Sequence, residues 1–198
     1  RSTPMSSIED ADADTKVETE QTANDNTIRF TLAGTEVLHF KKNVNGSLLM
    51  DVLDEGNSVN LGLEAGLNTH AEPTEYFGLE NVFVGYQSGK ANTGGSLNVA
   101  IGSQSLIANL TGDANTAIGA SALEANTTGH SNIGIGIWAL EDNTTGENNI
   151  AIGSNALGHT TVLNNQIAIG DSALFANTEG TGNLAIGKNA LWSNTDGG

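Results

Sequence analysis

Few residues of this chain have the types and spacing that chemistry requires. Asp10, Asp12 and Asp14 alternate with single residues, and calcium favours oxygen ligands in this arrangement. A calcium loop of that kind would need glycine and glutamate at the places taken by Thr15 and Gln21. The other interpretation of this acidic N-terminal segment is a solvated linker or an extended strand arm.

Patterns typical of catalysis are missing from the sequence. The four histidines fall at unrelated positions, so no metal-ligand spacing results. No serine lies in a G-x-S-x-G turn, and the chain has no cysteine. We therefore expect no enzymatic activity and no cofactor.

Large side chains at unusual places are the candidates for ligand contact. Phe175 and Trp192 share a repeat position that other copies fill with glutamate, which predicts exposure, and Trp138 is a third large aromatic residue. Exposed aromatic rings can stack on sugar rings; the alternative is that these rings pack on a neighbouring coil or on another chain. Val162 and Leu163 replace polar turn residues and are further candidates.

These candidates belong to a long array of repeats. A glycine recurs with a strict 17-residue period, within a sequence close to N-[VIT]-A-I-G-x-x-A-L-x-x-N-T-x-G. A fixed period of this kind is typical of solenoid proteins. The repeat glycines, expected where the backbone needs a positive φ or a close approach, are Gly85, Gly102, Gly119, Gly136, Gly153, Gly170 and Gly187.

The residues before each glycine predict a short strand. Residues 149–152 are β-branched and apolar, with Ile150 and Ile152 on one face and Ala151 on the other. We expect the isoleucines before the glycines to be stacked and buried, with the alanine face outermost and covered by another chain. The six residues after a glycine, such as 120–125, allow one helical turn or a second short strand. The isoleucines are Ile101, Ile118, Ile135, Ile152, Ile169 and Ile186; the leucines four after a glycine, including Leu123, Leu140, Leu157, Leu174 and Leu191, are expected in the core as well.

The asparagine four residues before each glycine is expected to form a stacked column. Gln166 takes the seventh place in it, and the N-T-x-G sequence closes each coil as a turn. The predicted fold is all-β: a parallel β-solenoid or β-roll of 17-residue coils, preceded by a small block of strands. The column consists of Asn81, Asn98, Asn115, Asn132, Asn149 and Asn183.

Changes in composition and sequence pattern divide the chain into four segments. Alternating apolar residues predict two or three half-buried strands before the array, with a hairpin turn at Asn45-Gly46, and this block is expected to cap the solenoid. The chain begins without Met and stops inside a repeat, so both ends are expected to be cuts in a longer polypeptide. The segments are an acidic linker or arm (1–26), the strand block (27–56), a degenerate coil with an inserted loop at 70–75 (57–80) and the array (81–198).

The charge limits the kinds of partner. The formal net charge is −16 at pH 7, which disfavours nucleic acid and anionic membranes, because both attract clustered Lys and Arg. No apolar stretch is long enough to cross a membrane, so direct membrane insertion is not expected. Each coil offers only two or three large apolar side chains, a thin core that favours assembly with identical chains.

The repeat also carries a family resemblance. The motifs NTAIG (115–119) and NTTG (126–129) resemble the head repeats of trimeric autotransporter adhesins, which commonly have a shorter period. They are more similar to the longer repeats of bacterial and phage fibre proteins, over residues 81–198 strongly and 57–80 loosely. The resemblance implies a homotrimeric β-roll in an extracellular, cell-surface, phage or injection-particle fibre that attaches to a cell-surface glycan or protein.

Two further functions stay open from the residues. A threonine ladder can order water in ice- or crystal-binding solenoids, and one repeat position holds Thr93, Thr127, Thr144, Thr161, Thr178 and Thr195, extended by Thr128 and Thr145. The I-G words also occur in acyltransferases with left-handed helices, but those proteins advance by hexapeptides and need a catalytic histidine. A structural and adhesive fibre segment is the function that the sequence favours.

Overall fold

The computed structural model describes residues 8–9, 16–19, 27–32, 35–42, 48–52, 58–68 and 78–194. The chain forms two compact units, Arg1–Asn57 and Ser58–Gly198. Three sequence predictions lie outside the described residues: the aspartates at 10–14, the Asn45-Gly46 turn and the loop at 70–75.

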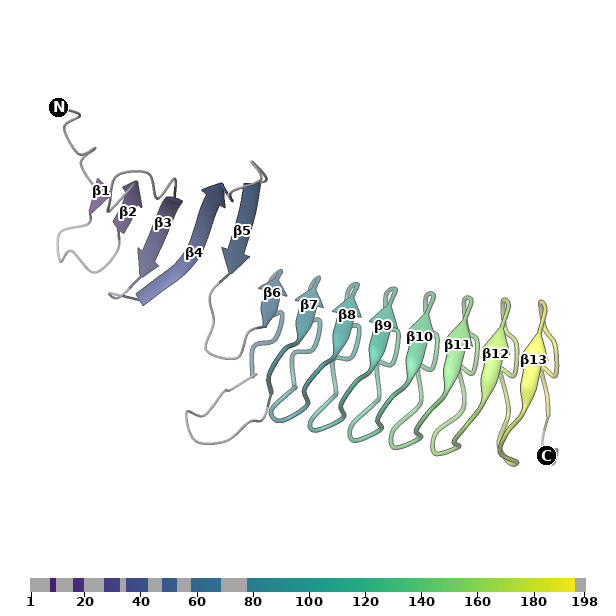
Figure 1. The fold of residues 1–198 in the computed structure, drawn as a ribbon. Coiled ribbons are helices and arrows are strands. Elements are labelled where there is room, and N and C mark those ends of the chain that lie inside the picture. Colours follow the sequence, from purple (N-terminus) through teal and green to yellow (C-terminus); the bar gives the residue numbers. More distant parts are fainter. Residues whose placement is uncertain are drawn as a thin grey trace. The chain divides into compact units, whose positions relative to one another are not determined.

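The first unit is an antiparallel sheet of five strands in the order of the chain (Figure 1). Its last three strands confirm the strands predicted within 27–53, and β1 and β2 extend the sheet into the acidic segment. β4 pairs antiparallel with β5, from Leu38 opposite Val52 to Lys42 opposite Leu48. The strands are β1 (Ile8–Glu9), β2 (Lys16–Thr19), β3 (Thr27–Leu32), β4 (Thr35–Lys42) and β5 (Leu48–Val52).

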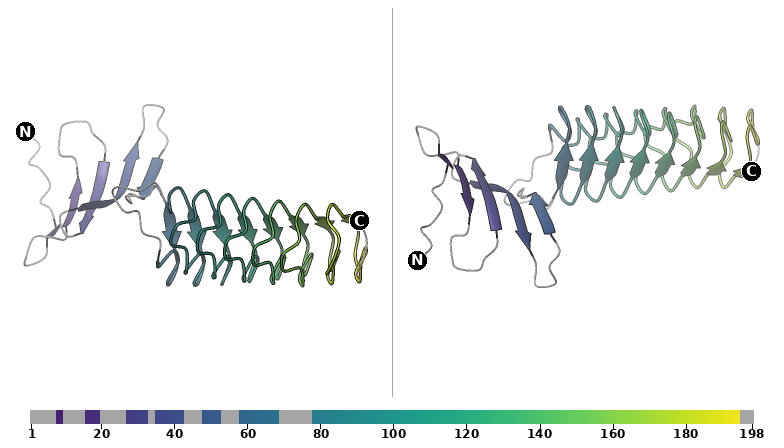
Figure 2. Two further views of the ribbon diagram at one scale, coloured as in Figure 1. Left: turned by 90° about the horizontal axis from the view of Figure 1, so that it is seen from below. Right: turned by 90° about the horizontal axis from the view of Figure 1, so that it is seen from above.

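The second unit is a parallel β-solenoid, as the sequence predicts (Figures 1 and 2). Each coil contributes one short strand, and consecutive strands pair in parallel with an offset of one repeat, as with Ile133 opposite Ile150. The offset between the first two strands is longer because of the inserted loop, and it runs from Val59 to Val82. The strands are β6 (Val59–Leu61), β7 (Val82–Val84), β8 (Val99–Ile101), β9 (Thr116–Ile118), β10 (Ile133–Ile135), β11 (Ile150–Ile152), β12 (Ile167–Ile169) and β13 (Leu184–Ile186).

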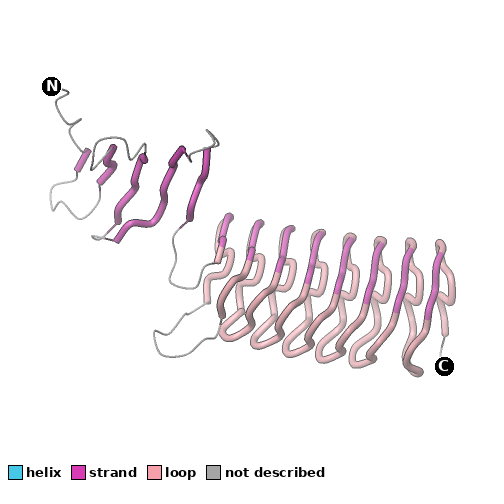
Figure 3. The backbone as a smooth tube through the Cα atoms, in the orientation of Figure 1, coloured by secondary structure: helices cyan, strands magenta, loops and turns pink. Residues whose placement is uncertain are grey.

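The rest of each coil consists of turns, so neither the helical turn nor the second strand forms in the described part of the array (Figure 3). The backbone turns through left-handed conformations two and four residues after each glycine; Ser121 has φ 55° and Leu123 has φ 53°. Such angles are uncommon for residues other than glycine. The coil retains them because its N–H groups are bonded to neighbouring coils, as Leu123 N donates to the carbonyl oxygen of Ala139 at 2.9 Å.

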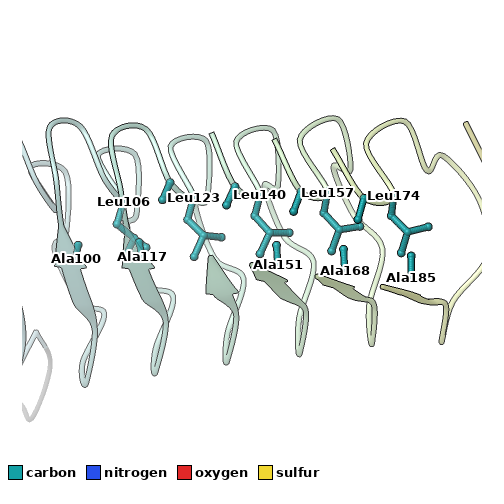
Figure 4. Close-up of a cluster of buried hydrophobic side chains, with 14 of the residues drawn as sticks. Ala100, Leu106, Ala117, Leu123, Leu140, Ala151, Leu157, Ala168, Leu174 and Ala185 are labelled. Carbon is teal, nitrogen blue, oxygen red and sulfur yellow. The ribbon is translucent and has the colours of Figure 1, made fainter. Parts of the chain in front are cut away.

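The core is made of small strand residues and large turn residues (Figure 4). In β11, Ala151 faces inward and is fully buried, and Leu157 from the following turn is fully buried in the same cluster. The burial of the leucines is confirmed for Leu123, Leu140, Leu157 and Leu174, while Leu191 of the last coil is 50% exposed. In most coils one leucine, set against an alanine, fills the interior.

The burial predicted for the isoleucines is wrong for the chain's own core. Ile152 is 37% exposed and Ile186 is 66% exposed, whereas the alanines between the outward residues are buried. The isoleucines are stacked, since Ile135, Ile152 and Ile169 are in register. Because side chains alternate along a strand, placing the alanine inside puts both of its neighbours outside.

The first full coil reverses the sizes of the two core positions. Phe83 occupies the inward strand position that is alanine in most later coils, and Gly89 replaces the leucine four after the repeat glycine. A Cβ atom at Gly89 would lie 2.4 Å from the Phe83 ring. The coil interior therefore holds one large side chain, which either position can supply.

The repeat glycines satisfy both predicted reasons for their presence, except Gly187 of the last coil, which has a positive φ but no close neighbour. Gly136 has φ 135°, a conformation that L side chains rarely adopt, and a Cβ atom there would lie within 2.6 Å of the carbonyl group of Gly153. Backbone atoms of successive coils approach each other along this edge. A side chain at this position would force the coils apart.

Buried asparagines form two hydrogen-bonded ladders inside the array. In the predicted column, the backbone N–H of Asn132 donates to Oδ1 of Asn115 at 3.0 Å. A second ladder uses the turn asparagines: the side-chain amide of Asn126 donates to Oδ1 of Asn109 at 2.9 Å. Both ladders are fully buried at these positions, so the polar groups of the turns are paired between coils.

Candidate interaction surface

The outward face of the parallel sheet is an apolar strip two side chains wide. Its residues are half-buried or exposed in the single chain, and Thr116 is the only polar one among them. The strip is defined as the first and third residues of β6–β13: Val59, Leu61, Val82, Val84, Val99, Ile101, Thr116, Ile118, Ile133, Ile135, Ile150, Ile152, Ile167, Ile169, Leu184 and Ile186.

The strip carries no charged side chain over eight consecutive strands, although the chain has a net charge of −16. Contiguous exposed apolar surface of this extent is typical of an interaction site in a soluble protein. Association of two such acidic chains requires a face on which carboxylates do not meet. The strip provides that face, and it consists of the larger aliphatic residues rather than of the predicted alanines.

Two exposed side chains follow the strip immediately after the repeat glycine of β10. Ile137 is 48% and Trp138 45% exposed, and Trp138 has φ 58° with its backbone N–H donating to the carbonyl oxygen of Ala120 at 3.1 Å. Tyr86, at the same place as Ile137 in the coil of β7, is 48% exposed. Trp138, a candidate from the sequence, thus follows the strip residue Ile135 by three positions in the chain and is exposed.

The other two aromatic candidates lie together in the last coils and stack on each other. The ring centroids of Phe175 and Trp192 are 5.8 Å apart with an interplanar angle of 13°. Phe175 also contacts His159, with centroids 4.4 Å apart and an angle of 57°. Gly158 provides room for this packing, because a Cβ atom there would lie 3.0 Å from the Phe175 ring. The alternative in which the rings pack on neighbouring coils is the geometry observed in the chain.

Acidic groups adjoin these rings. His159 Nδ1 lies 2.6 Å from Oδ2 of Asp142 in an exposed pair. Burial raises the pKa of the Glu141 carboxyl, and the nearby carboxylates of Asp142 and Glu124 raise it further. This edge of the array is therefore an acidic and aromatic surface.

Val162 and Leu163 lie on a different turn, where the repeat sequence changes. Val162 is 57% exposed, and Leu163 is half-buried. Thr160 replaces the ladder asparagine in this coil, and its hydroxyl donates to the carbonyl oxygen of Asn177 at 3.2 Å. As a result, Oδ1 of Asn143 is buried without a hydrogen-bond partner. The two apolar candidates thus accompany an interruption of the second ladder.

The threonines of the proposed water-ordering ladder donate to their own solenoid. Thr127 donates through Oγ1 to the carbonyl oxygen of Thr144 at 3.0 Å, and Thr144 donates in the same way to that of Thr161 at 3.0 Å. These hydroxyl groups connect successive turns. The arrangement does not favour a regular water-ordering face.

Within the described residues, no group of three or more His, Cys, Asp or Glu side chains is placed to hold a metal ion. Among the same residues, no helix has the length and apolar character to cross a membrane. Comparison with known proteins gives no match: no family model, no curated protein and no solved structure is similar to this chain.

Proposed function

We propose that this chain is a structural and adhesive segment of a homotrimeric fibre, carried outside a cell or on a phage-like or injection particle. The observation that carries the proposal is the uncharged apolar strip, which continues from β6 to β13. A thin core, with one large side chain set against small residues in each coil, leaves the larger aliphatic side chains outside, where a second sheet can cover them. Covering them stabilises the assembly by about 25 cal/mol per Å² of apolar area removed from water.

The number of copies comes from the resemblance to trimeric adhesin and fibre repeats, and the strip supplies the surface that such copies need. Because the strip follows the solenoid axis, associated copies share that axis and form a rod. Seven intervals between eight strands at about 4.8 Å give a rod segment of roughly 34 Å. A regular surface offers the same contact in every coil and so cannot select one ligand. Adhesion is therefore assigned to positions where the repeat changes, such as Phe175, Trp192 and residues 70–75.

Assembly is tested by light scattering on the purified chain at micromolar concentration, with circular dichroism to confirm folding. We expect a trimer, and we expect Ile135→Asp to give folded monomers because it places a carboxylate in the strip. Thr145→Asp is the matched control on an exposed turn and should remain trimeric. A folded monomeric wild-type chain would contradict the assembly.

Adhesion is tested separately, with cells and a glycan array. The intact segment is compared with Phe175→Ala/Trp192→Ala and with a variant that lacks residues 70–75. Loss of binding in either variant supports adhesion at that position. Unchanged binding in both places recognition elsewhere, and absence of binding by the trimeric wild-type segment opposes an adhesive role.

A further inference from the structure

The strip by itself does not define the axial register between two copies. Apart from Thr116 in β9, its outward positions hold only Val, Ile or Leu, with isoleucine at the third position from β8 to β13. Two copies shifted by one coil, about 4.8 Å, would therefore still place apolar side chains opposite apolar side chains. A fibre with a defined register needs a contact that occurs at one level only.

Ile137 and Trp138, which follow the strip residue Ile135 in the chain, provide such a non-repeating feature. The coil before has Ala120 and Ser121 at these two positions, and the coil after has Ser154 and Asn155. Both large side chains are nearly half exposed in the single chain. Their shorter neighbours leave them as the only large apolar pair at these positions between β9 and β11.

The backbone holds this pair in a defined orientation. Trp138 N–H donates to the carbonyl oxygen of Ala120, and the carbonyl oxygen of Ile137 accepts from Asn155 N–H at 2.9 Å. The pair is thus bonded to the coils on both sides. A tryptophan presents about 150–250 Å² of side-chain surface, and rigid aromatic anchors are frequent energetic centres of interfaces.

We infer that Ile137 and Trp138 lock the axial register between copies of this chain. The inference rests on the proposed homotrimer and adds the residues that determine its alignment. A second copy is the occupant because the pair is uncharged and follows the last strip residue of β10, Ile135, by two and three residues, on a chain that is otherwise acidic. With the copies aligned, Trp138 contacts the neighbouring copy at one level, and a shift by one coil loses that contact.

The register is measured by cross-linking. The chain has no cysteine, so Thr116→Cys introduces a single thiol in the strip for a short photo-cross-linker. Copies with this label are assembled with ¹⁵N-labelled copies, and mass spectrometry identifies inter-copy adducts. In this background we expect the adducts to be confined to a single coil of the partner. Adding Ile137→Ala and Trp138→Ser should spread the adducts to the equivalent positions of adjacent coils, with a several-fold larger share of shifted products.

Trp192→Ser is the matched control, because it removes the other tryptophan, which stacks on Phe175 within its own chain. It should preserve the single-coil pattern. The register lock is overturned if the Ile137→Ala/Trp138→Ser trimer keeps a single-coil pattern, or if copies with intact Ile137 and Trp138 already give adducts over several coils. If light scattering shows a monomer, the proposed trimer is refuted. If it shows a trimer whose adducts lie in several coils, only the register lock is refuted.

Fluorescence gives an independent measurement. The chain has two tryptophans, so Trp192→Phe leaves Trp138 as the only one. We expect its emission to shift to shorter wavelength and acrylamide quenching to fall as the concentration is raised through assembly. Unchanged emission and quenching in the assembled trimer would show that Trp138 stays in water, and would overturn the inference.

Discussion

At the level of single residues, each coil is governed by the room available inside it. The interior holds one large side chain, supplied by Phe83 in the first full coil and by leucines such as Leu106 afterwards. The residue on the opposite side is then small, Gly89 or Ala100. This pairing makes the two positions energetically dependent on each other.

Exchanging the large and the small side chain at positions 83 and 89 of the first full coil tests that dependence. Gly89→Leu alone should destabilise the array by about 1–3 kcal/mol, because it overpacks the coil against Phe83. Phe83→Ala/Gly89→Leu should recover most of the loss, since it recreates the Ala100 and Leu106 pair of the next coil. Urea unfolding of the two single variants and the double variant measures the coupling. Strictly additive losses would show that the two side chains do not share one space.

The Glu141 carboxyl predicts a pH dependence. Its pKa is raised in the folded chain, so its contribution to stability is present below the unfolded pKa and is lost as the pH rises through the folded value. Glu141→Gln should therefore raise the melting temperature at pH 7 and have little effect at pH 4. Exposed Glu179 supplies the control variant Glu179→Gln. An equal effect of the two substitutions at pH 7 would contradict a specific role for Glu141.

At the level of elements, the turns are joined by ladders that depend on sequence continuity. In regular coils, a Cβ atom at the turn glycine would approach Oδ1 of the ladder asparagine, as Gly129 would that of Asn126 at 2.4 Å. Leu163 is tolerated in the same place because Thr160 has no such oxygen there. The two substitutions are thus one structural change, which leaves Asn143 Oδ1 unpaired.

Restoring that turn gives a prediction for the ladder. Thr160→Asn/Leu163→Gly should stabilise the array by about 0.5–1.5 kcal/mol, because it supplies a donor to Asn143 Oδ1. Thr160→Asn alone should destabilise it, since the asparagine oxygen meets the Leu163 side chain. Thermal unfolding and amide exchange near residue 143 measure both effects. A stable Thr160→Asn single variant would argue against the proposed conflict.

The strands show what the sequence can and cannot predict. The 17-residue period, the parallel strands, the buried leucines and the first asparagine column follow from spacing alone. The inward face does not, because alternation in 150–152 assigns Ile150 and Ile152 to one face without saying which face is inside. The size of the coil interior decides this, and that size depends on how Leu157 enters it from the turn. The inward position is alanine in most coils, whereas the residue before it varies among Val, Thr, Ile and Leu, and this contrast is the signal that the sequence offers.

The interaction surface was predictable only in part, for the same reason. Trp138 was a candidate because of its size, but its relation to an apolar strip appears only when the isoleucines before it face outward. Phe175 and Trp192 occupy the same position in consecutive coils, which allows stacking between coils as readily as exposure to a ligand. The 57–80 segment illustrates another limit, since its inserted loop carries no repeat from which a conformation follows.

At the level of the whole molecule, the core and the strip contribute to stability under different conditions. Leu157→Ala should cost about 2–5 kcal/mol per chain at any concentration, because Leu157 is fully buried within its own coil. Ile152→Ala should cost clearly less in the monomeric Ile135→Asp background and more in the trimer. Unfolding at several protein concentrations separates the contribution of the core from that of the strip, since assembly makes the unfolding midpoint depend on protein concentration. Equal losses from Ile152→Ala in both backgrounds would show that the strip remains uncovered.

The direction of the inter-coil hydrogen bonds has a mechanical consequence. They join each strand to the next along the row from β6 to β13, so tension between the two ends of the array loads the coils in series. The terminal coil detaches first, and each later coil follows separately. Release of one coil lengthens the chain by roughly 50–60 Å, given about 3.3–3.6 Å per extended residue against a folded rise near 4.8 Å. An array of this construction yields under load by equal steps, and thus limits the force that reaches whatever is attached to its end.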